Sequence, residues 1–462
     1  MNSPVIIWFR RDLRLSDQAA VTAAAARGPV IPVFVLDDET PGDRKMGAAS
    51  RWWLHHSLKS LDQRLREKDS RLILKCGNAG KVLADIAREA GAKEIHALHH
   101  YEPWWLNAEK KVRDALDNKA ELVLHDGNYL LPPGVVTTGN GDPYKIFTPF
   151  WKSLRAIMPP SDTVPVPQKL ESPQQWPLGD NLEDWKLLPS PNWAAGFEDV
   201  WKPGENGARA NVDKFIEKAP HYDAGRNLPS KQLVSRLSPH LHFGEISPSH
   251  VWHRITAHHS NVETYLKELG WRDYAQTVIY QFPQYGSESY REQFCIFPWR
   301  DMGDAQVRKE FKAWCDGETG YPIVDAGMRE LWSTGWMHNR VRMIAASFLI
   351  KHLLIDWREG EQWFWDTLVD ADFASNSVNW QWVAGTGVDS NMFVRIMAPL
   401  TQSEKFNAGD YIRKWVPELA DISDPYIHDP EEDGVKPANY PTKIISHKNA
   451  RERALTAYRE IK

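Results

Sequence analysis

The sequence has few cysteines and no long apolar run. Only three of its 462 residues are cysteine, with no spacing that suits a disulfide framework or a metal site, which fits a reducing compartment. Its longest apolar stretch, at 344–355, is interrupted by Lys351 and His352 and is too short to span a membrane. We therefore expect a cytoplasmic protein without a bound metal ion and without contact with a membrane.

An excess of one charge is also absent. Lys and Arg total 56 and Asp and Glu total 61, for a formal net charge of −5. Without a general positive field, contact with nucleic acid would need a local cluster of basic side chains. The apolar run at 5–9 begins almost at once and is followed by Arg10 and Arg11, so no signal peptide is expected.

The first 128 residues alternate between short β-rich runs and helical stretches, but no Gly-x-Gly-x-x-Gly fingerprint follows any of the runs. The alternation predicts a doubly wound, Rossmann-like parallel sheet covered on both faces, with ligands at the carboxyl ends of the strands. The missing fingerprint argues against a standard dinucleotide site. The β-rich runs are 5–9, 30–36, 71–75, 94–99 and 121–125, and the helical stretches are 18–26, 48–67, 80–90 and 105–118.

Residues 129–203 are rich in Pro, Trp, Ser and Asp and show no sustained period. They predict an interdomain linker; a linker of this length is usually packed or functional, but we expect a plain spacer. From 204 to 462 the period is helical, which predicts an all-α domain. Its expected helices are 208–218, 248–258, 262–282, 305–317, 321–334, 335–354, 362–368, 403–415 and 450–462.

The least ordinary stretch is 368–382, which holds Asp370, Asp372, Asn376, Trp380 and Trp382. Carboxylates beside indoles make a poor core, because a buried charge without a partner is costly. They make a good wall for a large, flat ligand with polar edges, since indoles stack and short acids and amides give fixed hydrogen bonds.

A second stretch, at 335–343, offers partners for these acids. On a helix Asn339, Arg342, Met343 and Ala346 share one face, so Arg342 could neutralise one of the two aspartates. An amphipathic helix with one buried ion pair explains each stretch alone. The two together favour a ligand site.

Two further segments are candidate sites. Ser235 and Ser238 flank Arg236 before Pro239, which suits an anion site at a helix start, although a capped helix explains the same pattern.

At 265–274, Glu268, Trp271, Arg272 and Ala275 share a helical face. The pattern has two interpretations: the face lines a pocket, or it carries only an exposed Glu268–Arg272 ion pair.

Basic and aromatic residues give weaker signals. Arg226, Arg340, Arg395 and Lys405 could form the local basic patch that phosphates need, or could simply be solvated. The 22 tryptophans exceed what core packing usually requires. They favour aromatic ligand binding or electron transfer along a line of indoles.

Four segments of the sequence resemble the photolyase/cryptochrome family, and class III cyclobutane pyrimidine dimer photolyases most of all. The motifs are Trp-Phe-Arg-Arg-Asp-Leu-Arg-Leu-Ser-Asp at 8–17, Gly-Tyr-Pro-Ile-Val-Asp-Ala-Gly-Met-Arg at 320–329, Gly-Trp-Met-His-Asn-Arg-Val-Arg-Met at 335–343, and the acid-and-indole stretch. The resemblance covers nearly the whole chain. It implies an α/β antenna domain at 1–128 and a helical domain at 204–462 that binds FAD and DNA.

The resemblance also implies roles for individual residues. Asn376 would face the flavin nitrogen N5, and Glu268 would hydrogen-bond a base of the lesion. The FAD-binding residues would be Tyr222, Val234, Ser235, Arg236, Leu237, Ser238, Tyr265, Arg272, Asn339, Arg342, Asp370, Asp372 and Asn376. The substrate pocket would comprise Glu268, Trp271, Asn339, Met343 and Trp382, and Arg226, Arg340 and Gln402 would contact DNA.

The resemblance identifies only part of the family's electron-transfer chain in this sequence. Trp380 and Trp357 match its two inner tryptophans, whereas the outer position falls near Asp304. Trp299 is the nearest substitute and Trp314 the second. A branch through Trp363 or Trp365 is a further possibility.

The antenna site also departs from the best-known pattern, because Tyr-Glu-Pro-Trp-Trp at 101–105 replaces its folate ligands. The resemblance to class III suggests 5,10-methenyltetrahydrofolate in a different cleft. The residues expected there are Arg10, Asp12, Met46, Arg51 and Trp105.

The implied function is light-driven repair of cyclobutane pyrimidine dimers in ultraviolet-damaged DNA by a monomeric deoxyribodipyrimidine photo-lyase. Six-four photolyases have histidines in place of Asn339 and Met343, and plant cryptochromes have Asp and Tyr in place of Asn376 and Trp382. The alternatives are a cryptochrome-type blue-light receptor without repair activity and a helical flavoprotein oxidoreductase. The sequence leaves open the antenna, the outer tryptophan, the choice between single- and double-stranded DNA, and any signalling role.

Overall fold

The computed structural model describes residues 3–390, 392–432, 434–435 and 437–462. The chain forms two compact units, each assembled from separate stretches of sequence. The N-terminal unit comprises Met1–Asn192, Trp201–Pro220 and Ser235–Pro283, and the C-terminal unit comprises Trp193–Val200, His221–Val234 and Gln284–Lys462. The three-part division at residues 128 and 203 stays a prediction.

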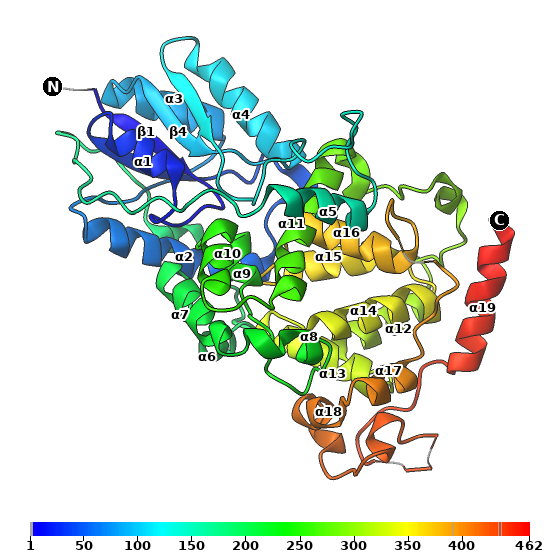
Figure 1. Ribbon diagram of the computed structural model, residues 1–462. Coiled ribbons are helices and arrows are strands. Elements are labelled where there is room, and N and C mark those ends of the chain that lie inside the picture. Colours follow the sequence, from blue (N-terminus) through cyan, green and yellow to red (C-terminus); the bar gives the residue numbers. More distant parts are fainter. Residues whose placement is uncertain (1–2, 391, 433, 436) are drawn as a thin grey trace. The chain divides into compact units, whose positions relative to one another are not determined.

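A five-stranded parallel sheet organises the first part of the N-terminal unit (Figure 1). Its strand order is β3-β2-β1-β4-β5, with β1 paired to β2 on one side and to β4 on the other. This arrangement confirms the predicted doubly wound sheet. The strands are β1 Val5–Phe9, β2 Val30–Leu36, β3 Ile73–Cys76, β4 Glu94–Leu98 and β5 Glu121–His125.

Burial on both faces explains why β1 and β2 are apolar throughout. Ile6 and Trp8 point into a core shared with α3 and α4, and alternation along the strand turns Ile7 and Phe9 to the opposite face. The helices of this unit are α1 Ala19–Ala25, α2 Ala48–Arg66, α3 Ala79–Ala90, α4 Pro103–Leu116, α5 Phe147–Ile157, α7 Glu205–Ile216, α9 Ser238–His242, α10 Pro248–Thr256 and α11 Glu263–Gln281.

The predicted plain spacer is wrong at α5, which packs against α11. Phe147 stacks on Trp271 with ring centroids 3.6 Å apart, and Trp151 lies against Gly270, where an added Cβ would be 2.5 Å from the indole. The apolar residues of this segment fall at i, i+3, i+4 and i+7 from Phe147, a helical pattern hidden between proline-rich flanks.

The C-terminal unit is helical, and no strand lies in its described residues. The predicted helix at 335–354 instead begins at Asn339, because Gly335 is left-handed (φ 66°) and closes the preceding helix; it continues past Ser347 as a π turn. The predicted helix at 403–415 is two helices, separated at left-handed Asn407 (φ 48°). The helices are α6 Phe197–Val200, α8 Tyr222–Gly225, α12 Ala305–Asp316, α13 Pro322–Thr334, α14 Asn339–Ser347, α15 Trp357–Thr367, α16 Phe373–Ala384, α17 Pro399–Lys405, α18 Gly409–Trp415 and α19 His447–Glu460.

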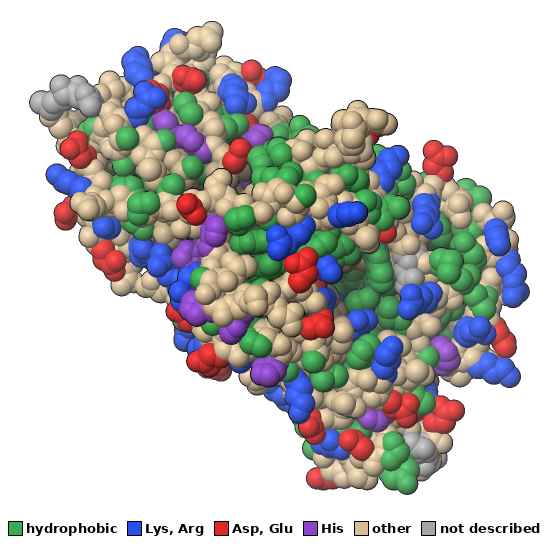
Figure 2. All heavy atoms as spheres, viewed as in Figure 1, with side chains coloured by type: hydrophobic (Ala, Val, Ile, Leu, Met, Phe, Trp, Pro, Cys, Tyr) green, Lys and Arg blue, Asp and Glu red, His purple; other side chains and the backbone are tan. Residues whose placement is uncertain are grey.

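Within the described ranges, none of the helices has the length and apolar character needed to cross a membrane. Figure 2 shows acidic and basic side chains interspersed over the face in view, in keeping with the small net charge.

Replacing Gly244 by Ala should destabilise the N-terminal unit by about 2 kcal/mol or more. Gly244 has φ 61°, and an added Cβ would lie 2.3 Å from the carbonyl oxygen of Arg11 and 2.6 Å from Cα of Asp12. These are backbone atoms that cannot rotate away. Urea unfolding measures the change, with Gly139→Ala as the control because nothing lies within 4 Å of a Cβ there. Equal stability of the two variants would contradict the prediction.

Candidate functional site

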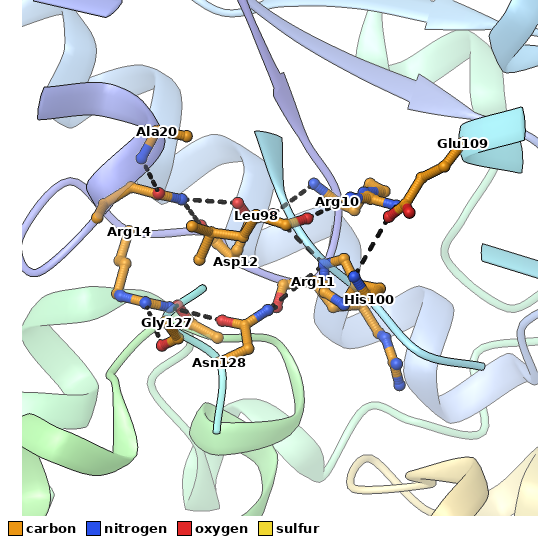
Figure 3. Close-up of polar contacts among 12 residues, drawn as sticks. Arg10, Arg11, Asp12, Arg14, Ala20, Leu98, His100, Glu109, Gly127 and Asn128 are labelled. Carbon is orange, nitrogen blue, oxygen red and sulfur yellow. Dashed lines mark hydrogen bonds and ion pairs between the residues drawn. The ribbon is translucent and has the colours of Figure 1, made fainter. Parts of the chain in front are cut away.

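The arginines of the 8–17 motif turn inward at the carboxyl end of β1 (Figure 3). Arg10 donates to Glu109 at 2.8 Å and to the carbonyl of Leu98, and its guanidinium lies 4.2 Å from the centre of the Trp8 ring. Burial opposes ionisation of Glu109, but bonds from His99 and Arg10 lower its pKa to about 2. This Arg–Glu pair is therefore part of the structure of the sheet edge.

Asp12 and Arg14 complete the same network. The Asp12 carboxylate accepts from the backbone amide of Arg10 and from the side-chain amide of Gln18, both at 2.6 Å. Arg14 donates to Asn128 and to the carbonyl of Gly127 at 3.0 and 2.8 Å. The polar groups of the motif bind one another and the strand ends.

The five predicted antenna residues differ in how deeply they are buried. Arg10 and Asp12 are enclosed, with exposed fractions of 2% and 0%, so a ligand does not reach them in this structure. Met46, Arg51 and Trp105 are half-buried. Arg51 donates to the carbonyl of Met46 at 3.0 Å and to Asp38 at 2.6 Å, and the buried Trp105 Nε1 lacks a hydrogen-bond partner.

Helix α11 carries the predicted pocket face of the N-terminal unit. Glu268, Trp271 and Arg272 are half-buried along it, whereas the next residue of the same face, Ala275, is buried. Arg272 donates to the carbonyls of Asn128 and Leu241, so its guanidinium is fixed by backbone oxygens. Phe147 covers one face of the Trp271 indole.

The segment at 235–238 leads into the short helix α9, which begins at Ser238. Arg236 is left-handed (φ 52°), and Leu237 donates its backbone amide to the Ser235 hydroxyl at 3.3 Å. Ser235 also hydrogen-bonds the hydroxyl of buried Tyr265, and burial raises the pKa of that phenol. The segment thus presents hydroxyls and an arginine side chain on an irregular backbone.

In the C-terminal unit, α16 begins within the acid-and-indole stretch. Asp372 is its N-cap and accepts the backbone amide of Ser375 at 2.8 Å. Arg342 on α14 donates to Asp370 Oδ2 at 2.9 Å and to the carbonyl of Met337 at 2.7 Å. The predicted ion pair is therefore confirmed, with Asp370 as the partner.

Further along α16, the side chains differ in exposure. Asn376 is buried and donates to Glu361 of α15, a partner that carried no signal in the sequence. Trp382 on this helix and Met343 on α14 are half-buried, and Asn339 is exposed. The face predicted for α14 is thus only partly covered by the protein.

The candidate electron-transfer tryptophans differ in their contacts. Trp380 is buried and packs edge-on against Phe364 and Trp314, with ring centroids 5.0 and 6.4 Å away. Trp357 is fully buried and donates to the Ser289 hydroxyl. Trp299, half-buried, packs against Phe297.

Three of the four candidate basic residues cluster. Arg340 and Lys405 both lie over the Phe406 ring, 4.6 and 5.5 Å from its centre. Burial lowers the pKa of Arg340, and Arg226 nearby lowers it further. For the fourth residue, Arg395, the structure shows a different contact: its carbonyl accepts from buried Lys351 at 3.0 Å.

Each unit, taken by itself, carries side chains whose chemistry suits a part of FAD. The C-terminal unit provides a fixed Arg–Asp pair, a rigid amide and indoles for a flat ring with polar edges. The N-terminal unit provides serine hydroxyls, Arg236 and Arg272, which suit hydroxyl and phosphate groups. Val234, Tyr222 and Gln402 are half-buried or buried side chains of the C-terminal unit. Among the described residues no group of His, Cys, Asp and Glu is arranged to hold a metal ion.

Two family models match this chain. Residues 265–460 match the FAD binding domain of DNA photolyase, and residues 5–170 match the DNA photolyase family. A deoxyribodipyrimidine photo-lyase of Agrobacterium fabrum is 46% identical over the whole chain and 98% of its own length. The chain belongs to the photolyase/cryptochrome family.

Three other members of this family are similar to the chain over nearly its whole length. The crystal structure of a class III photolyase from Agrobacterium tumefaciens shares 44% identity over 100% of this chain and 98% of its own, with a TM-score of 0.94. Cryptochrome-2 of Arabidopsis thaliana is 37% identical over 98% of this chain and 78% of its own. An archaeal photolyase from Sulfolobus tokodaii, described with two FAD molecules and a novel light-harvesting cofactor, has 30% identity, covers 99% of this chain and 100% of its own, and gives a TM-score of 0.85.

Proposed function

We propose that this protein is a light-driven deoxyribodipyrimidine photo-lyase that repairs cyclobutane pyrimidine dimers with FAD. The proposal is carried by the Arg342–Asp370 pair and the anchored Asn376, which both fall within the part matching a photolyase FAD domain. When bound, reduced FAD supplies the light-driven one-electron chemistry. The FAD-binding residues are those named above in each unit.

The substrate is a dimer that has left the duplex, since photolyases belong to the base-flipping enzymes. Trp271 in the N-terminal unit and Trp382 in the C-terminal unit, both half-buried, would each stack on bases of the dimer, as aromatic side chains do with single-stranded bases. Glu268 would bind a base carbonyl. Arg226 and Arg340, with Gln402, would contact the phosphate backbone, and their clustering supports this role.

Two measurements test the function. Purified protein should show flavin absorption bands, and blue light should restore ultraviolet-irradiated oligothymidine while darkness should not. A colourless protein that takes up no FAD would refute the proposal. Bound flavin without repair would favour the cryptochrome alternative, for which the likeness to Cryptochrome-2 is the supporting observation. Turnover of a nicotinamide in the dark would favour an oxidoreductase.

We assign the antenna to 5,10-methenyltetrahydrofolate at Met46, Arg51 and Trp105, the half-buried members of the predicted set. Extraction and chromatography of the bound chromophores tests this choice. A second equivalent of flavin would overturn it and would match the description of the Sulfolobus protein. The protein would act in the cytoplasm as a monomer.

Replacement of Glu268 by Ala should lower the repair yield per absorbed photon about tenfold without lowering FAD content. The side chain lies half-buried between Tyr265 and Arg272 on α11, and its loss removes a hydrogen bond to the dimer that strengthens as charge develops. Single-turnover repair and the flavin-to-protein absorbance ratio measure the two effects. Glu263→Ala, at the start of the same helix, is the control. Loss of FAD instead of repair would make Glu268 a structural residue.

A further inference from the structure

The guanidinium of Arg340 is held by two uncharged side chains. Its Nε and Nη2 atoms both donate to the side-chain oxygen of Asn227, at 3.2 and 2.7 Å. One face of the group lies over the Phe406 ring, 4.6 Å from its centre. These contacts use one edge and one face of the planar group. The edge formed by Nη1 and Nη2 keeps two parallel N–H groups for a bidentate acceptor.

A chain of hydrogen bonds fixes Asn227 relative to this arginine. Ser230, three residues further along the chain, accepts the backbone amide of Tyr411 at 3.1 Å. The Tyr411 hydroxyl and the backbone amide of His338 both donate to the Glu330 carboxylate, at 2.7 and 3.0 Å. His338 is the N-cap of α14, whose first turn carries the arginine. The acceptor and the guanidinium are thus held by one network within the C-terminal unit.

The charge of this guanidinium is not cancelled by the groups that hold it. Among the described residues no Asp or Glu pairs with Arg340. Burial lowers the pKa of Arg340, and the nearby charge of Arg226 lowers it further. Two like charges kept near each other favour an anion between them, and phosphate oxygens match the spacing of two parallel N–H groups.

We infer that Asn227 is a positioning residue that holds Arg340 ready to bind one phosphate of the DNA backbone. The inference rests on the proposed function, in which Arg340 contacts DNA. An arginine that is already ordered loses less side-chain freedom when it binds, which raises affinity. A carboxylate at this position would also order the side chain but would offset its attraction for phosphate. The neutral amide of Asn227 orders the arginine and leaves its charge to the DNA.

The salt dependence of DNA binding tests this role. The full chain with FAD bound is titrated in the dark with ultraviolet-irradiated oligothymidine at several salt concentrations. The slope of log affinity against log salt concentration reports the number of phosphates neutralised, at about 0.7 per phosphate for a single strand. Arg340→Met should therefore reduce the magnitude of the slope by about 0.7. Asn227→Ala removes no charge, yet it should reduce the slope by at least about half as much, because the arginine is no longer held at the phosphate.

The two substitutions should also be coupled in affinity. At the lowest salt concentration Arg340→Met should weaken binding about tenfold in the parent, but less than about threefold in the Asn227→Ala background. Asn449→Ala is the matched control, since it removes an exposed side-chain amide from α19 and should leave the slope unchanged. The flavin-to-protein absorbance ratio shows whether each variant is folded. If Asn227→Ala loses flavin, Asn227→Ser replaces it with the same expected slope.

The outcomes separate the inference from the proposed function. A parent slope in Asn227→Ala, with a reduced slope in Arg340→Met, overturns the role of Asn227 and leaves repair standing. An unchanged slope in Arg340→Met overturns the inference as well, because no phosphate is then bound there. A parent protein that does not bind the irradiated oligothymidine refutes the proposed function first, and the inference with it.

Discussion

Replacement of Trp380 by Phe should abolish light-driven reduction of oxidised FAD, yet repair should persist once the flavin is reduced chemically. Phenylalanine is far harder to oxidise than tryptophan, so the first step of electron supply is lost. Repair itself does not use this residue, because the electron that opens the dimer returns afterwards. Photoreduction under blue light with an external donor, and repair after dithionite treatment, measure the two activities.

The surroundings of Trp380 make this substitution interpretable. The indole is 3% exposed and packs against Phe364, Trp314 and the α15 backbone at Gly360. A Phe side chain fits in the space of the indole and should lower the free energy of unfolding by about 1–3 kcal/mol, which leaves the fold intact.

Trp332→Phe is the matched control, since that indole is 44% exposed and stacks on Trp363 at the surface. Undiminished photoreduction in the Trp380 variant would remove this residue from the chain of carriers. The same assay on Trp299 and Trp314 variants decides the outer position; only Trp314 is in described contact with Trp380.

Most of the fold could be predicted from the sequence because most strands and helices are marked by local patterns of residues. Strands β1, β2 and β5 lie at the predicted residues, since each is a short β-rich run between turns. The prediction missed α5, whose apolar period is masked by neighbouring prolines, and α16, which buries polar as well as apolar residues and so shows no apolar face in the sequence.

The contacts that could be predicted from the sequence were those in which a buried charge needs a partner. Contacts that depend on how helices pack could not be predicted. Arg342 and Asp370 pair as expected, because an acid beside indoles requires a cation. Arg10 and Asp12 were predicted to contact the antenna. In the structure Arg10 instead donates to Glu109, and Asp12 accepts from Gln18. Glu361 could not be chosen from the sequence, since no period links it to Asn376; only the approach of two helices at Gly360 does.

Replacement of Arg342 by Met should destabilise the C-terminal unit by about 3 kcal/mol and lower FAD retention more than about tenfold. The pair is asymmetric in exposure, with 21% for the Arg side chain and 3% for Asp370. Removing the guanidinium leaves the carboxylate buried without this cation, while Met preserves much of the packing of the aliphatic stem.

Arg358→Met is the matched control for stability. Arg358 pairs with Asp356 at 2.7 Å, but both side chains are more exposed, at 36% and 24%, so the loss should stay below about 1 kcal/mol. Urea unfolding gives the stabilities, and the flavin-to-protein absorbance ratio after gel filtration gives retention. Equal destabilisation by both substitutions would mean that burial of Asp370 does not govern the energy of its pair.

A double variant separates the structural role of Arg342 from its role in binding. Arg342→Met combined with Asp370→Leu removes the buried charge together with its partner, and such replacements often recover the lost stability. FAD retention should stay low in this variant, because both groups that would hold the flavin ring are gone. Recovery of stability together with flavin would show that Arg342 and Asp370 serve only the fold, and that the cofactor is held by other residues.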